Sequence, residues 1–337
     1  MAAISPTVMS PSTAAKTGPR WKWPLVWLAL LVIGLMAPRV ITSGYYLGVM
    51  ISIMTLGIAA VGIGFLMHQC GFVMFGVAAF IGLPAYLVGI ATNYGMGLHG
   101  AVLAALAGST VFAALVGALV VRARPLPFSM LTLALAQMLK SAATLQSMRP
   151  ITSGDDGMTM TFKGTFMGLS QSQLAKNDAF WPIALIALAL ALLIAWKAAT
   201  SRFGQVLRAT QANEERMRFS GFDTYLPRLL AFILACFLVS ISGVLIALHS
   251  AFASPELLDF ATGGNALIAM LIGGAANVLG PLLGALLYTV AQDYFGSTGY
   301  LELLTGIAIV VMIWVFPKGA MGLVLALWTR ITRGGKA

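Results

Sequence analysis

Long apolar runs alternate with short polar segments along almost the whole chain. Stretches of about 20 apolar residues can cross a lipid bilayer as helices, whereas a membrane barrel needs short alternating strands. The pattern predicts an all-α polytopic membrane protein with about 9–10 transmembrane helices. These segments lie at about 24–38, 44–66, 73–93, 99–121, 125–145, 180–198, 226–250, 262–276, 279–295 and 301–317.

Polar segments divide the chain further. Residues 1–20 are rich in Ser, Thr and Pro and predict a disordered tail, while residues 326–337 form a basic tail. Between them, about 21–325 is the predicted transmembrane domain. The longest loop on one side of the membrane is predicted at 146–179, and the longest on the other side at 199–225.

Composition agrees with this pattern. The chain is 59% hydrophobic and only 9% charged, with a mean hydropathy of +0.92, which excludes an ordinary soluble domain. The net charge of +10 follows the predicted topology and is not concentrated as in a nucleic-acid-binding face. Fifteen basic residues can lie on one side, which is then cytoplasmic together with both termini: Lys16, Arg20, Lys22, Arg122, Arg124, Lys197, Arg202, Arg208, Arg216, Arg218, Arg228, Lys318, Arg330, Arg333 and Lys336. Such a surface also favours anionic membrane lipid and not nucleic acid.

The sequence motifs of several enzyme and transporter classes are absent from this chain. No GxxxxGK[ST] phosphate loop occurs, and no Asp or Glu lies in the middle of an apolar segment. The three histidines and two cysteines are too scattered to predict a metal site. The sequence therefore predicts neither an ATPase nor an intramembrane enzyme, and no cofactor within this chain.

One charged stretch interrupts the apolar pattern, ATQANEERMRFSGFD at Ala209–Asp223. Glu214 and Arg218 are four residues apart, a favourable spacing on a helix, and Gly221 is placed as a helix C-terminal glycine. An amphipathic helix is therefore predicted at about 207–220. Because apolar Met217 and Phe219 lie among the charges, the stretch favours docking to a cytoplasmic partner over a plain solvated connector.

At this point the chain resembles the LivM-type permeases of branched-chain amino acid ABC transporters. The run FGQVLRATQANEERMRFSGFD is similar to the loop through which such permeases contact their ATPase. GFVMFGVAAFIGLPAY at Gly71–Tyr86, TSGDDGM at Thr152–Met158 and GGAANVLGPLLGALL at Gly273–Leu287 resemble three further family segments, in the same order. Phe72, Met74 and Asn277 depart from the family pattern.

The resemblance implies a type II ABC importer-like permease in the bacterial inner membrane. Its partners would be a second permease subunit, two ABC ATPase subunits that hold the ATP and Mg, and a substrate-binding protein outside the membrane. The implied ATPase-coupling residues are Arg208, Asn213, Glu214, Glu215, Arg218 and Gly221.

Two glycine-interrupted apolar segments in opposite halves of the chain are typical of a transport pathway, although such glycines also serve helix packing. The predicted path residues are Gly71, Phe72, Met74, Phe75, Gly76, Gly82, Gly273, Gly274, Asn277, Gly280 and Pro281. Asp155 and Asp156, in a tight-turn sequence, form either a plain turn or a contact for the binding protein.

Two alternatives remain at the sequence level. A stand-alone carrier or channel would use the charged stretch only as a connector, and a membrane scaffold would leave the paired glycine segments unexplained. The resemblance implies branched-chain amino acids as the solute, with urea and amides as related possibilities.

Overall fold

The computed structural model describes residues 43–162, 164–275 and 277–296, with a few single positions on either side. The predicted tails at 1–20 and 326–337 lie outside the described residues. Most of the predicted segments 24–38 and 301–317 also lie outside them.

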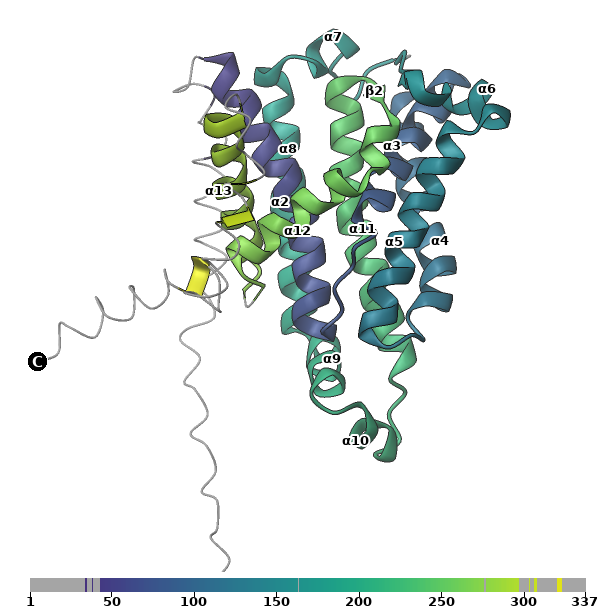
Figure 1. Ribbon diagram of the computed structural model, residues 1–337. Helices are drawn as coiled ribbons and strands as arrows, with labels where there is room; N and C mark the ends of the chain where they lie inside the picture. Colours follow the sequence, from purple (N-terminus) through teal and green to yellow (C-terminus); the bar gives the residue numbers. More distant parts are fainter. Residues whose placement is uncertain are drawn as a thin grey trace, which may run out of the picture.

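The described chain is a bundle of apolar helices (Figure 1). Four of its helices are long and apolar enough to cross a membrane: α2 (Gly44–Cys70), α4 (Leu98–Val120), α8 (Asn177–Thr200) and α11 (Tyr225–Ser250). A fifth span is possible where α5 (Pro125–Thr144) continues, after a 63° bend, into Gln146–Asp156. The prediction of an all-α polytopic membrane protein is confirmed.

Three predicted segments form helices that are shorter than expected. They are α3 (Val77–Asn93), α12 (Phe260–Gly273) and α13 (Gly280–Phe295), with 17, 14 and 16 residues. At 1.5 Å per residue even α3 reaches only about 25 Å, less than the roughly 30 Å hydrocarbon core. Before α3 the chain runs from the end of α2 back into the bundle as a non-helical segment, 71–76 (Figure 1).

The connections gather at the two ends of the bundle. One end carries η1 (Gln146–Met148), α6 (Arg149–Thr152), η2 (Gly154–Asp156), α7 (Gln171–Leu174) and η3 (Pro255–Leu258), with the two-stranded antiparallel sheet of β1 (Met158–Thr159) and β2 (Phe252–Ala253). Met158 pairs with Ala253 and Thr159 with Phe252. The opposite end carries α9 (Arg202–Ala212) and α10 (Glu214–Phe219), as Figure 1 shows. The two long predicted loops therefore lie at opposite ends.

Helix α2 is the central helix of the bundle. It contacts α8, α11, α12 and α13, and 72% of its most apolar 18-residue stretch is buried. In contrast, only 28% of the corresponding stretch of α4 is buried. This helix exposes Leu103, Leu115 and Leu119. A helix that is apolar all round is typical of a membrane bundle, where its outer face meets lipid or another subunit.

Helices α12 and α13 pack backbone against backbone. A Cβ atom on Gly273 would lie 1.9 Å from the carbonyl oxygen of Gly280, and one on Gly284 would lie 1.8 Å from that of Ala269. Only glycine permits so close an approach, which is a common device where membrane helices meet. The predicted glycine-interrupted segment therefore forms a tight helical hairpin.

Candidate functional site

The charged stretch forms two helices and not one, so the prediction of a single helix over 207–220 is wrong. Helix α9 ends at Ala212, because Asn213 adopts an extended conformation (φ −160°, ψ 98°). The Asn213 side chain then accepts a hydrogen bond from the Arg216 backbone N–H and caps α10. An N-capping asparagine thus introduces the break.

Helix α10 ends at Phe219, and Gly221 follows as the predicted C-terminal glycine. Gly221 has φ +79°, its N–H donates to the carbonyl of Arg218, and the Phe222 N–H donates to the carbonyl of Met217. This pair of bonds is a Schellman motif, in which glycine takes the left-handed position. The turn directs the chain from α10 towards α11.

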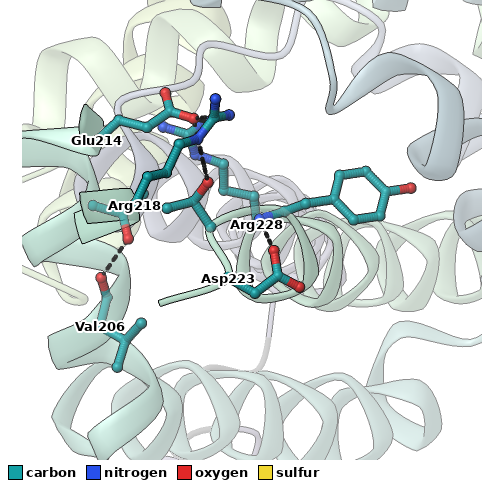
Figure 2. Close-up of polar contacts among 8 residues, drawn as sticks. Val206, Glu214, Arg218, Asp223 and Arg228 are labelled. Atoms are coloured by element: carbon teal, nitrogen blue, oxygen red, sulfur yellow. Dashed lines mark hydrogen bonds and ion pairs between the residues drawn. The ribbon is translucent and has the colours of Figure 1, made fainter. Parts of the chain in front are cut away.

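Glu214 fastens α10 to α11. Its carboxylate lies 2.7 Å from the Arg218 guanidinium, as the sequence spacing predicted, and 2.8 Å from that of Arg228 in α11. Thr224 donates a further hydrogen bond of 3.3 Å to the same oxygen. Figure 2 shows Glu214, Arg218 and Arg228 converging at one point.

These contacts change the acidity of Glu214. Partial burial raises the pKa of its carboxyl, but the hydrogen bond from Arg228, the charges of Arg228 and Arg218 and the Thr224 hydrogen bond outweigh burial. The pKa therefore lies below its ordinary value. Glu214 is held as an anion between two cations.

Arg228 continues the connection into the bundle. Its side chain is only 14% exposed, and the guanidinium carbon lies 5.3 Å from the centre of the Phe72 ring, within cation–π range. Phe72 in turn stacks on Phe128 of α5, with ring centres 4.7 Å apart. Glu214 is thus linked through Arg228 to the non-helical segment 71–76 and to α5.

Helix α9 is fastened to the bundle separately. Arg208 donates hydrogen bonds of 2.8 Å to the Gln69 side chain, near the end of α2, and of 2.9 Å to the Ala199 carbonyl in α8. Gln69 is 1% exposed, so its hydrogen bond to Arg208 satisfies a buried amide. Both surface helices are therefore tied to membrane helices by arginine.

The first group of predicted path residues lies around segment 71–76. Phe72 and Met74 are buried in the apolar core, where Met74 contacts Cys236, while Phe75 is partly exposed. Gly71 ends α2 and lies next to Gln211 of α9, and Gly76 packs against the backbone of Thr132 in α5. In the structure Phe72 and Met74 serve packing, and their role in a path stays a prediction.

The second group lies around the α12–α13 hairpin. Gly273, Gly274 and Gly280 form its close backbone contact, and Gly82 of α3 packs against Leu258. Asn277 and Pro281 line a small void of about 10 Å³ next to His68 and Gln69. Their role in a path likewise stays a prediction.

The two acidic residues of the predicted external turn lie in η2. Asp156 forms an ion pair of 3.0 Å with Arg149, and both side chains are largely exposed, while Asp155 is also exposed. Both are exposed, and η2 directly follows α6, which lies at the end opposite α9 and α10 (Figure 1). Their contact with a binding protein stays a prediction.

Neither a disulfide nor a metal cluster is found where the structure describes the chain. Cys70 and Cys236 are free and buried, and no group of three or more His, Cys, Asp or Glu residues in the described part could hold a metal ion. Glu215, the remaining predicted coupling residue, is exposed on α10.

Two features of the structure were missed by sequence reasoning. Arg228 counted only as a basic residue, although its position in the first turn of an apolar helix could have suggested a buried partner. Hydroxyl and amide residues within the apolar runs, such as Thr55 and Asn265, also passed without comment. Their spacing carried no motif, and only the packing of several helices brings them together.

Comparison with known proteins gives a consistent assignment. The family described as the permease component of branched-chain amino acid transport systems matches residues 45–316. The high-affinity branched-chain amino acid transport system permease protein LivH of Salmonella typhimurium, and that of Escherichia coli K12, are each 25% identical to the chain over 210 residues. This alignment covers 59% of the chain and 67% of the relative.

No solved structure matches the chain. The relatives are of the LivH type, so the predicted family is confirmed and the LivM subtype within it stays a prediction. The chain belongs to the family of branched-chain amino acid transport permeases.

Proposed function

We propose that this protein is a transmembrane subunit of an ATP-binding-cassette importer in the bacterial inner membrane. It forms the pore with a second permease, receives its solute from a binding protein and is driven by two separate ATPase subunits. The solute is a branched-chain amino acid or a related small compound. Both chain termini and the end that carries α9 and α10 face the cytoplasm.

The connection from Glu214 through Arg228 to Phe72 is the observation that carries this proposal. A helix that only joins two spans needs no partly buried ion pair directed into the bundle. Here a displacement of α10 would be transmitted to α11 through Arg228 and to segment 71–76 through Phe72. The arrangement suits a surface that is pushed by an ATPase and moves membrane helices in response.

Phe219 gives α10 an exposed apolar side chain for that partner. Phe219 is 91% exposed, and Met217, two residues earlier in α10, is half-buried. An exposed aromatic side chain on a short helix fits a groove on a cytoplasmic protein. Glu214 lies on the inward side of the same helix, so docking and transmission use different residues.

The Glu214→Lys variant tests the proposal in the complex purified with its partners. Charge reversal places a lysine beside Arg218 and Arg228, so we expect ATP hydrolysis to continue while coupled uptake falls at least about tenfold. Asp178→Lys, a charge reversal at the exposed first turn of α8 on the opposite end, is the matched control and leaves uptake unchanged. Unchanged coupled uptake in Glu214→Lys would reject the coupling role. A chain that purifies alone, under conditions that keep a control ABC complex intact, would instead favour a stand-alone carrier.

A further inference from the structure

A chamber with hydrogen-bonding groups in its wall lies between the helices of the bundle. Its volume is about 160 Å³, and it is bordered by α2, α3, α11, α12 and α13 of this one chain. Eight of its twelve described lining residues carry a hydroxyl or amide group, although apolar atoms make up most of the wall surface: Ser52, Thr55, Ser242, Thr262, Asn265, Tyr288, Thr289 and Gln292. Polar groups within a membrane bundle are costly and commonly mark the route of a polar solute.

The chamber adjoins a wider basin at the end of the bundle opposite α9 and α10. This basin has a volume of about 630 Å³ and is lined by Tyr45, Asn177 and Asp293, among others. Ser52, Thr289 and Gln292 border both spaces. Hydrogen-bonding side chains therefore lie where the basin and the chamber meet.

Some polar groups in the wall form hydrogen bonds within the protein, and others do not. The Ser242 hydroxyl donates to the Thr55 carbonyl, and the Tyr288 hydroxyl donates to Asn265 Oδ1 at 2.7 Å. In the described part of the chain, the Asn265 amide nitrogen and the side chains of Thr289 and Gln292 form no hydrogen bond. These three groups offer N–H and O–H donors, together with acceptor oxygens, to a bound molecule.

The wall also determines the charge that the chamber accepts. Among its described lining residues none is Asp, Glu, Lys, Arg or His, so an ion would enter without a counter-charge. Leu56, Ile81 and Ile246 form an aliphatic part of the wall, where a hydrocarbon side chain would pack. Because a net charge in such surroundings is unfavourable, the chamber suits a small molecule with a polar end, an aliphatic end and no net charge.

We propose that this chamber is a solute site within the permease subunit itself and that it selects against solutes with a net charge. Asn265, Thr289 and Gln292 bind the polar end, and Leu56, Ile81 and Ile246 receive the aliphatic end. Selection by charge therefore takes place in the membrane as well as on the binding protein. This inference rests on the proposed transport function.

Cysteine labelling of the full chain in membrane vesicles tests the charge selection. A Thr289→Cys thiol in the chamber is treated with uncharged iodoacetamide or with iodoacetate, an anion of almost the same size. Met167→Cys, exposed at the same end, gives the intrinsic rate ratio of the two reagents, and the parent protein with its buried Cys70 and Cys236 gives the background. We expect the ratio at position 289 to exceed that at position 167 by at least about tenfold.

Protection of the same thiol tests solute binding. The probes are L-leucine, isovaleramide and urea, which carry no net charge, and the keto acid analogue of leucine, which is an anion. At about ten times its dissociation constant, a bound solute slows labelling about tenfold. We expect this protection from at least one probe without net charge and none from the anion. Ser52→Cys at the chamber entrance gives a second reporter if Thr289→Cys does not fold.

Three outcomes would overturn the inference: equal reagent ratios at positions 289 and 167, equal protection by the anion, or no protection by any of the probes without net charge. ATP-dependent uptake by the same vesicles, supplied with the partner subunits, is measured separately. Charge-selective protection without such uptake would support the chamber while rejecting the importer. Uptake without protection would support the importer and reject the chamber.

Discussion

At the scale of single residues, Glu214 makes the folded state sensitive to pH. The pKa of its carboxyl is lowered in the folded protein. Its ion pairs therefore stabilise the fold fully above the ordinary carboxyl pKa, and this stabilisation is lost as the pH falls through the pKa of the folded state. We expect Glu214→Gln to lower the stability by about 1 kcal/mol at neutral pH, since the ion pairs are partly exposed. The difference from the parent should vanish in acid, as thermal unfolding in detergent at several pH values would show. A difference that does not change with pH would contradict the ion-pair explanation.

The contacts of Glu214 show which interactions the sequence spacing predicts and which it does not. The Glu214–Arg218 pair was predicted because a helix brings residues four positions apart together, and Gly221 because a helix end needs a left-handed residue. Arg228 could not be assigned to Glu214 in this way. Their contact depends on the turn at Gly221 and on the packing of α10 beside α11, which sequence spacing alone does not determine.

At the scale of elements, the α12–α13 hairpin depends on glycine. In Gly284→Ala the new methyl group would meet the Ala269 carbonyl, so we expect a loss of about 3 kcal/mol or more and a lower melting temperature. Gly264→Ala is the matched control, because nothing lies within 4 Å of its Cβ position in the same hairpin. That variant should keep or slightly raise the melting temperature, since alanine favours the helix. Equal melting temperatures for the two variants would show that the backbones are not packed so closely.

Element boundaries were predictable where apolar runs end and less so within polar stretches. The predicted segments 125–145 and 226–250 lie within one residue of α5 and α11, whose starts are marked by Arg124 with Pro125 and by Asp223. The break at Asn213 was missed, although asparagine is a strong N-capping residue, because charged residues continue on both sides of it. Likewise, the predicted segment 73–93 wrongly included the non-helical residues before α3, because these residues are as apolar as the helix itself.

At the scale of the whole molecule, the distribution of charge predicts the orientation in the membrane. Arg122, Arg124, Lys197 and Arg202 lie in or next to the connections at the α9–α10 end, and lysine and arginine favour the cytoplasmic side. In intact cells, an impermeant maleimide should therefore label Met167→Cys and not Phe219→Cys, although both positions are exposed. Permeabilising the membrane should make Phe219→Cys equally reactive, which serves as the control for exposure. The opposite pattern would place α10 outside the cell, where no ATPase could reach it, and would reject the coupling role of Glu214 together with the orientation.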